Sequence, residues 1–299
     1  MGPHIVPCLW LDQQAEQAAE LYTRVFGGRI LDASRYPESF DNPSRRPRGS
    51  VATVEFELRG RRFTALNGGP VFRINPSVSF FVYTDSAAQT DELCATLGEG
   101  GKFMIPPGRY PWSERYGWVE DRFSVSWQVM TNPRPAGSAG IVPCLMFADA
   151  QHGQAEAAMK AYTAIFPDSK IDTIQRYGAD RGPEGKVVHG RFVLAGQDFT
   201  AMDSHEARGA TFNEAVSFRV LCEDQREIDH YWASLSEGGR ASACGWLKDS
   251  FGLSWQVVPS RISALLASPD TQANERAFRA VLEMRKLDIE KLDAAFAAR

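Results

Sequence analysis

The chain has 299 residues, enough for two ordinary domains. Apolar residues make up 43% and charged residues 23%, the usual mixture of a globular protein. A formal net charge of −4 argues against nucleic acid or an anionic membrane surface as a partner, and no apolar run is long enough to predict a membrane-spanning helix. The five cysteines form no Cys-x-x-Cys pair and the N-terminal stretch lacks the layout of a secretory signal, so we expect a reduced, cytoplasmic protein.

The N-terminal part of the chain predicts a strand, a helix and three further strands. A short apolar run at residues 5–11 is typical of a strand. Residues 15–26 place apolar side chains at i, i+3, i+4 and i+7, which predicts a helix with one buried face. The three strands are expected at 29–36, 51–58 and 63–66, with Arg59-Gly60 as the turn before the last. We call this βαβββ unit a module.

A second module follows in the same order. Residues 78–83 predict a strand, and residues 90–98 predict a helix that a glycine ends. An insertion, PPGRYPWSER at 106–115, precedes the final strands and is either a lid or a solvated loop. The last strand is expected at 126–130.

The whole arrangement is then written a second time. GWVEDRFSVSWQV at 117–129 returns as GWLKDSFGLSWQV at 245–257, and IVPCL at 5–9 returns at 141–145. Each copy is too long for a solenoid repeat and has the size of a domain. We expect a first domain at 1–131, a Pro/Gly/Ser linker at 132–140 and a second domain at 141–260. A helical tail at 261–299 should contain a helix over 270–287 and a second helix capped by Asp288, packed on the second domain or on a partner chain.

Several segments together resemble the PhnB-like family, which is also catalogued as the 3-demethylubiquinone-9 3-methyltransferase family. These are IVPCLWLD, the AEQAAELYTRVF helix, LNGGPVFRINPSVSFFV and CGWLKDSFGLSWQVVPS. The family belongs to the vicinal oxygen chelate superfamily, with glyoxalase I, bleomycin resistance proteins and extradiol dioxygenases. The resemblance implies an α+β fold of tandem vicinal oxygen chelate domains, each with two βαβββ modules that form a curled sheet around a cavity, followed by the helical tail.

The resemblance also implies where a metal would bind. Members of the superfamily usually hold a divalent metal at the cavity floor through His or Glu on the first and last strands of each module. This chain has Gln128 and Gln256 where the last strands of glyoxalase-like members carry Glu, and a neutral amide is a weak metal ligand. We therefore predict no metal cofactor. The alternative is a divalent metal held by Asp203 and His205, which lie two residues apart on one strand.

The polar side chains at these places predict a ligand site instead. Alternation along SWQV sends Trp127 and Gln128 to opposite faces of the sheet, so each glutamine should face its cavity. The predicted ligand-binding residues are Asn67, Gln128, Asp203, Gln256, Trp118, Trp246 and Cys244.

Three functions remain open from the sequence. The protein binds a small organic molecule without a metal, or it is a degenerate enzyme of the superfamily (a lyase, a dioxygenase or the family's nominal methyltransferase), or it has a structural or assembly role. The glycine-rich stretches at 98–102 and 236–240 follow helices rather than strands, so they do not match a nucleotide-type cofactor turn. The partner is expected to be a small molecule of unknown identity, and the chain a monomer or a homodimer.

Overall fold

The structure is a computed structural model that describes residues 4–39, 42, 44–132, 140–179, 182–206 and 209–298. Most of the predicted linker, residues 133–139, lies outside the described residues.

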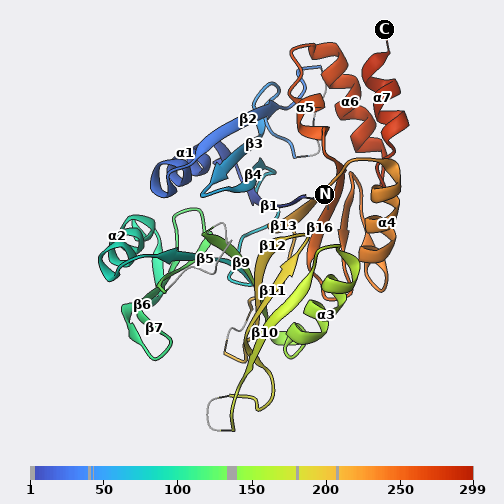
Figure 1. Cartoon of the computed structure of the whole chain (residues 1–299). Coiled ribbons are helices and arrows are strands. Elements are labelled where there is room, and N and C mark those ends of the chain that lie inside the picture. Colours follow the sequence, from blue (N-terminus) through green and yellow to red (C-terminus); the bar gives the residue numbers. More distant parts are fainter. Residues whose placement is uncertain are drawn as a thin grey trace.

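The chain contains four βαβββ modules and a helical tail, in the predicted order (Figure 1). Module 1 consists of β1 (His4–Leu11), α1 (Ala15–Phe26), β2 (Arg29–Arg35), β3 (Val51–Leu58) and β4 (Arg61–Asn67), and module 2 of β5 (Val78–Thr84), α2 (Ala87–Gly98), β6 (Lys102–Tyr110), β7 (Ser113–Glu120) and β8 (Ser126–Thr131).

The second repeat supplies the other two modules. Module 3 consists of β9 (Ile141–Phe147), the short η1 (Asp149–Gln151), α3 (Ala155–Ile165), β10 (Lys170–Arg176), β11 (Val187–Leu194) and β12 (Gln197–Asp203). Module 4 consists of β13 (Val216–Cys222), α4 (Gln225–Ser236), β14 (Arg240–Ala241), β15 (Trp246–Lys248) and β16 (Ser254–Pro259). The segments 117–129 and 245–257 occupy equivalent strands, with Trp118 opposite Gln128 and Trp246 opposite Gln256, so the repeat predicted from sequence is confirmed.

The strands form two eight-stranded sheets, each built from both repeats. Sheet A has the order β14-β15-β16-β13-β1-β4-β3-β2, and sheet B has the order β10-β11-β12-β9-β5-β8-β7-β6. Sheet A therefore joins modules 1 and 4 through the antiparallel pair β1–β13, and sheet B joins modules 2 and 3 through β5–β9.

This pairing corrects one expectation. The family resemblance implied that both modules of a sheet come from the same repeat, whereas each sheet takes one module from each repeat. The reason is that β5 and β13 share the pattern Val-Ser-Phe-x-Val, so local sequence does not distinguish β5 from β13 as the neighbour of β1. Modules of the same repeat meet instead through their outer faces. The Phe63 and Phe80 rings contact at 5.3 Å, and the Phe199 and Phe218 rings at 5.5 Å.

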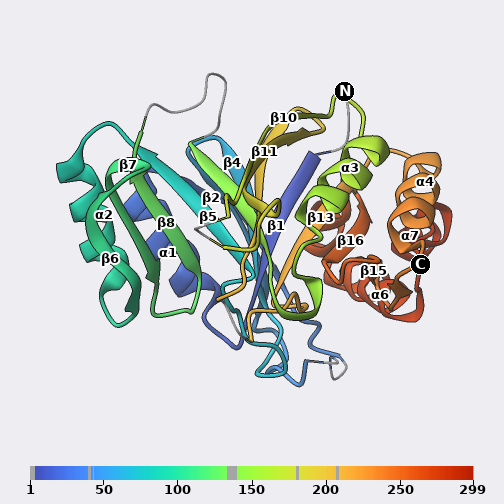
Figure 2. The ribbon, with the colours of Figure 1, turned by 90° about the horizontal axis from the view of Figure 1, so that it is seen from below.

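Each sheet has an outer face covered by its helices and an inner face that points away from them. Helices α1 and α4 cover sheet A, and α2 and α3 cover sheet B. The helices of the first repeat lie on one side of the molecule and those of the second on the other (Figure 2). The main core fills the outer faces of both sheets, and it contains Trp127 and Val129 of β8 and Trp255 and Val257 of β16.

The aspartate of the repeated segment ties each repeat together. One carboxylate oxygen of Asp121 accepts hydrogen bonds from the Tyr22 hydroxyl (2.7 Å) and the Trp127 indole (2.8 Å). The other oxygen accepts the backbone N–H groups of Phe123 (2.8 Å) and Val125 (3.0 Å), which shapes the turn before β8. Because Tyr22 belongs to module 1 and Asp121 to module 2, this buried carboxylate joins the two sheets.

Asp249 repeats the arrangement in the second copy. It accepts the Tyr162 hydroxyl (2.7 Å), the Trp255 indole (2.8 Å) and two backbone N–H groups of its turn. Burial raises the pKa of both Asp121 and Asp249, although these hydrogen bonds act in the opposite direction. The duplicated Asp-x-Phe and Ser-Trp pattern is thus a structural brace.

The tail forms α5 (Ile262–Leu266), α6 (Thr271–Glu283) and α7 (Ile289–Ala297). Asp270 and Asp288 cap α6 and α7 by accepting backbone N–H groups. The helix expected over 270–287 ends earlier, at Glu283, because the next two backbone carbonyls accept hydrogen bonds from outside the helix. Those of Met284 and Arg285 accept the backbone N–H groups of Cys244 and Gly245 (both 2.7 Å).

The insertion left open as a lid or a loop is part of a hairpin whose register shifts at several bulges. β6 and β7 pair from Lys102–Glu120 to Tyr110–Ser113, whereas the matching β14 and β15 are short. At the tip, the Trp112 ring stacks on Tyr110 at 5.1 Å and is 56% exposed.

Among the described residues, no helix is both long and apolar enough to cross a lipid bilayer.

We predict that Asp121→Ala and Asp249→Ala each lower the free energy of unfolding by about 2–4 kcal/mol, because each change leaves buried donors without an acceptor. Urea denaturation followed by tryptophan fluorescence measures this loss. The control is Asp32→Ala on the exposed strand β2, expected to stay within about 0.5 kcal/mol of the original protein. A loss below about 0.5 kcal/mol for both buried aspartates would show that the braces contribute nothing.

Candidate functional site

The centre of each inner face carries the same four residue types. On sheet B they are Cys144, Thr200, Ser79 and Gln128, from β9, β12, β5 and β8. Register places Cys144 opposite Ser79 and Thr200, so the four side chains meet where the first and last strands of the two modules are adjacent. On sheet A the corresponding residues are Cys8, Thr64, Ser217 and Gln256.

Gln128 is fixed by side chains on sheet B. It is 2% exposed, its amide nitrogen donates to the Ser79 hydroxyl (2.8 Å), and its carbonyl accepts the Tyr116 hydroxyl (2.6 Å). Trp118 lies on the same face, and its indole donates to the Ser126 hydroxyl at 2.6 Å. The structure therefore brings Gln128 and Trp118 together, as alternation predicts.

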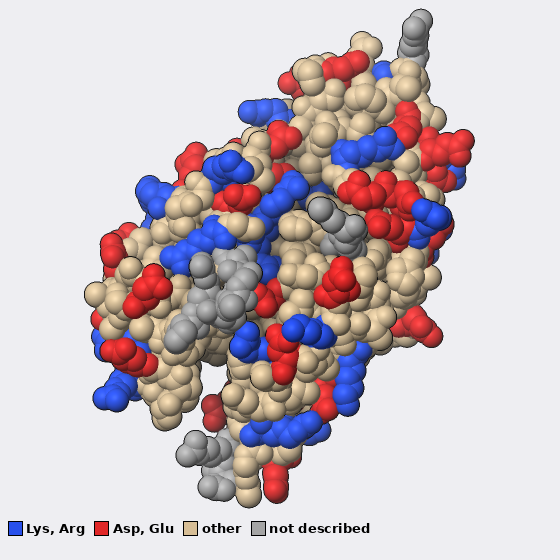
Figure 3. All heavy atoms as spheres, viewed as in Figure 1, with Lys and Arg blue, Asp and Glu red and all other residues tan. Residues whose placement is uncertain are grey.

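Apolar side chains surround Gln128 and Trp118. The buried members of this inner-face cluster are Phe81, Tyr116, Trp118, Met130, Val142, Cys144, Met146 and Ala210. Tyr83, Ile105, Tyr110 and Met202 form its half-buried rim. The space-filling view shows the surface notched between the β6–β7 hairpin and strands β10 and β11, the two margins of sheet B (Figure 3).

The inner face of sheet A is covered by the tail. Val6, Leu221 and Val258 of the sheet form a cluster with apolar residues of the tail, namely Ile262, Ala277, Leu287 and Leu292. Gln256 is 8% exposed and donates to the Ser217 hydroxyl at 2.9 Å. Cys244 stands where sheet B has Tyr116, so Gln256 lacks the hydroxyl that holds Gln128.

A buried ion pair also fastens the tail to sheet A. Arg219 of β13 pairs with Glu55 of β3 and donates to the Thr64 hydroxyl (2.8 Å). Ser263 of α5 joins the pair, accepting from Arg219 (3.2 Å) and donating to Glu55 (3.0 Å). Burial alone would raise the pKa of Glu55, but the charge and hydrogen bonds of Arg219 lower it below its ordinary value.

The four central residues do not fit a divalent metal. Burial raises the pKa of Cys144 to about 11 and also raises that of Cys8, so both thiols stay protonated at neutral pH. Hydroxyls and a neutral amide complete the set, without the imidazole or carboxylate that such ions need. Within the described ranges, no three His, Cys, Asp or Glu residues lie together as a metal site.

Asn67 and Asp203 end equivalent strands and both hold the start of a helix. The Asn67 side chain accepts the Ala15 N–H (2.8 Å) and donates to Glu16 and to the Val51 carbonyl. Asp203 accepts the N–H groups of Gly153, Ala155 and Val187 at 2.8–3.1 Å. Both side chains thus hold neighbouring backbone, and we leave them out of the ligand site proposed below.

The other predicted residues are dispersed. His205 lies beyond the end of β12, half-exposed and paired with Glu206 at 3.7 Å, while Asp203 is buried. Trp246 packs edge-on against Trp10 with ring centroids 6.0 Å apart. Cys244 is partly buried, and burial raises its pKa, which disfavours a reactive thiolate.

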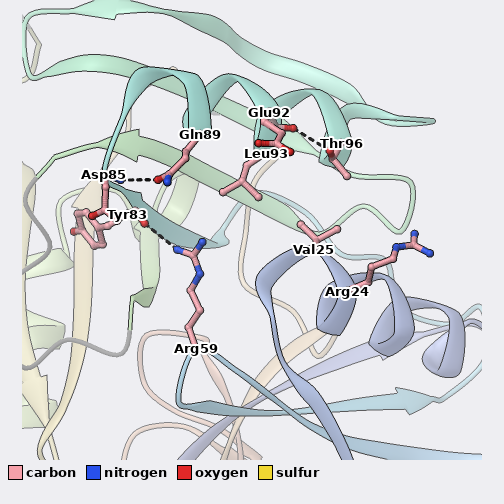
Figure 4. A pocket seen from close by; sticks show the side chains of 9 residues that line it. All are labelled: Arg24, Val25, Arg59, Tyr83, Asp85, Gln89, Glu92, Leu93 and Thr96. Atoms are coloured by element: carbon pink, nitrogen blue, oxygen red, sulfur yellow. Dashed lines mark hydrogen bonds between the residues drawn. The ribbon is translucent and has the colours of Figure 1, made fainter.

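A groove of about 990 Å³ lies away from both inner faces, between α1 and α2 (Figure 4). Arg24 of α1 and Arg59 of the β3–β4 turn line one side. Glu92 of α2 and Asp85, just before that helix, line the other. In the second repeat the matching contact between α3 and α4 is closed, because Phe166 stacks on Tyr231 at 5.1 Å, whereas Leu93 takes the tyrosine's place in the first repeat. None of the predicted site residues lines this groove.

Sequence reasoning missed the charged residues of the inner faces. Glu55 and Arg219 were not singled out, and neither was Arg191, which β11 places on sheet B at the position that Glu55 has on sheet A. The signal was present in the repeat: VATVEFEL aligns with VVHGRFVL, and a charge changes sign at an otherwise similar strand position.

The comparisons with known proteins first define the class. Glyoxalase I from Zea mays is similar over 86% of this chain and 92% of its own, with a TM-score of 0.55 and 13% identity. A likeness at this identity shows the fold alone, and it confirms the α+β fold that the sequence predicted. No curated protein matches the chain.

The family follows from the sequence match. The family model described as 3-demethylubiquinone-9 3-methyltransferase matches residues 3–130 and 139–258, and the chain belongs to this family. A PhnB protein from Bacillus cereus, described with the same methyltransferase name, is 28% identical over 42% of this chain and 98% of its own (TM-score 0.39). A protein from Pseudomonas aeruginosa is 25% identical over 43% of this chain and 97% of its own (TM-score 0.36).

We predict that Glu55→Gln lowers the free energy of unfolding by about 3–5 kcal/mol at pH 7, because Arg219 would remain buried without its counter-charge. The pKa of Glu55 is depressed in the folded protein, so its contribution is present above the unfolded value of 4.5 and is lost as the pH falls through the folded value. Denaturation curves at pH 7 and below pH 4.5 should therefore show the difference between Glu55→Gln and the original protein shrinking in acid. An equal difference at both pH values would contradict this assignment.

We also predict that Zn²⁺, Ni²⁺ and Mn²⁺ at a few equivalents raise the melting temperature by less than about 1 °C. A metal that did bind the folded protein would give a clear shift, because a ligand at 100 times its Kd stabilises the folded state by about 2.7 kcal/mol. Elemental analysis after gel filtration should find far less than one such metal per chain. A stoichiometric retained metal would refute the reading of the Cys-Thr-Ser-Gln centre.

Proposed function

We propose that the protein binds a small organic molecule on the inner face of sheet B, without a catalytic metal. The observation that carries the proposal is the contrast between the two inner faces. Sheet A is closed by the tail and by an internal ion pair, whereas sheet B presents a half-buried aromatic and thioether rim around a central amide. Such a lining, mainly apolar with a few placed polar groups, is typical of small-molecule sites.

The central amide is suited to orient the ligand. A glutamine side chain has two donor hydrogens and a carbonyl with two lone pairs, and Gln128 uses one donor and one lone pair on Ser79 and Tyr116. A ligand hydrogen-bonded to the remaining amide groups would have its apolar body against Trp118 and Met146. Tyr116 and Ser79 hold the amide in one orientation before the ligand arrives, which reduces the entropic cost of binding.

Methyl transfer is not part of the proposal. A cofactor-binding turn of the nucleotide type follows a strand and opens a helix. Here the glycine-rich stretches end α2 and α4, where Gly100 and Gly238 adopt positive φ angles of 74° and 68°. These glycines therefore serve the ends of helices.

We predict that the neutral aromatic amide 2-naphthamide binds at one site per chain, and that Gln128→Leu weakens this binding about 2- to 10-fold through loss of one hydrogen bond. Isothermal titration calorimetry measures both the stoichiometry and the affinity. The matched control is Gln256→Leu, which makes the same change beneath the tail and should leave affinity within about twofold. Absence of saturable binding, or an equal effect of both variants, would overturn the proposal.

A further inference from the structure

Arg191 is a basic side chain on the inner face of sheet B. It is opposite Thr200 across β11 and β12, and Thr200 is opposite Cys144 of the central group. Alternation along β11 puts Arg191 and His189 on one face, and the contact of His189 with the Phe81 ring at 5.9 Å shows that this is the inner face. The guanidinium therefore belongs to the same surface as the aromatic cluster.

On sheet A, the position equivalent to Arg191 is occupied by a charged residue that has a partner of opposite charge. Glu55 aligns with Arg191, and on sheet A its carboxylate pairs with the guanidinium of Arg219. On sheet B the residue that aligns with Arg219 is Phe81. One charge has changed sign and its partner has become an aromatic ring. Sheet A is thus neutralised from within, and sheet B retains a cation beside an aromatic surface.

Among the residues that the structure describes, the guanidinium of Arg191 forms no hydrogen bond and no ion pair, and only its backbone is bonded, in the β11–β12 pair. Asp198 is the nearest acidic residue along β12. It is opposite Val193, one residue pair away from Arg191 on the same face, and it forms no ion pair with Arg191. Burial, and after it the charge of Arg191, lowers the pKa of His189, so this imidazole is uncharged at neutral pH.

Tyr83 completes the surroundings of the cation. Its ring stacks against Phe81 with centroids 6.4 Å apart at the half-buried rim. Burial raises the pKa of Tyr83 to about 12, so its hydroxyl stays protonated and can donate to an anion. The rim thus offers a guanidinium and a hydroxyl donor beside an apolar surface.

We propose that the ligand of sheet B is an aromatic or other apolar molecule with an anionic group, and that Arg191 binds this group. The inference rests on the proposed ligand site of sheet B and deepens it. The ligand's carboxylate would supply the charge that Glu55 supplies on sheet A, and its apolar body would lie against Phe81 and Trp118. Arginine suits this role because its planar fork binds a carboxylate through two parallel hydrogen bonds.

The test compares two probes that differ in charge alone, 2-naphthoate and its neutral amide 2-naphthamide, by calorimetry at pH 7. We expect Arg191→Gln to weaken 2-naphthoate binding about 10- to 100-fold and to leave 2-naphthamide within about threefold. Arg191→Lys, which keeps the charge and loses the fork, should fall between. The control Arg24→Gln removes an exposed arginine on α1 and should change neither affinity.

The outcomes separate this inference from the proposed function. If both probes bind and Arg191→Gln weakens them equally or not at all, the anionic-group inference is wrong and the ligand site stands. If neither probe binds saturably to the original protein, both proposals fail. Retained binding of 2-naphthamide by Arg191→Gln also shows that the variant is folded, so a selective loss of 2-naphthoate reports the charge.

Discussion

The buried carboxylates of Asp121 and Asp249 tie a helix over one sheet to a turn of the other sheet in each repeat. Each accepts four hydrogen bonds, from a helix tyrosine, a strand tryptophan and two turn N–H groups. Since the tyrosine lies on a helix that covers one sheet and the aspartate in a turn of the other, the brace orients one sheet against the other within a repeat. Cross-repeat strand pairing then closes both sheets, and the inner faces are left to diverge without disturbing the core.

The two inner faces have diverged in opposite directions. Sheet A received a cover of three helices and an internal ion pair, and Gln256 there retains a hydrogen bond to Ser217 beneath the tail. On sheet B, Gln128 lies between Ser79 and Tyr116, and a cation stands where sheet A has a carboxylate.

The sequence was sufficient for much of this picture. Helix periodicity and the repeated segment predicted the modules, and alternation along SWQV predicted that Gln128 and Trp127 face opposite sides. The partners of Asn67 and Asp203 could not be predicted, because a polar residue at the end of a strand serves a cavity or a helix start depending on where the chain turns next. Pairing across repeats was equally hidden, since it depends on long-range packing between nearly identical strands. Arg191 and Glu55 were visible, but only by comparing the repeats position by position.

We propose one ligand site in this chain, on the inner face of sheet B. A crystal structure of the protein grown with 2-naphthoate would locate the bound molecule. We expect electron density for one molecule, with its carboxylate at Arg191 and its ring against Trp118, and an unchanged contact between the tail and sheet A. A naphthoate molecule seated in the groove between α1 and α2, or beneath the tail, with the inner face of sheet B unaltered, would contradict this proposal.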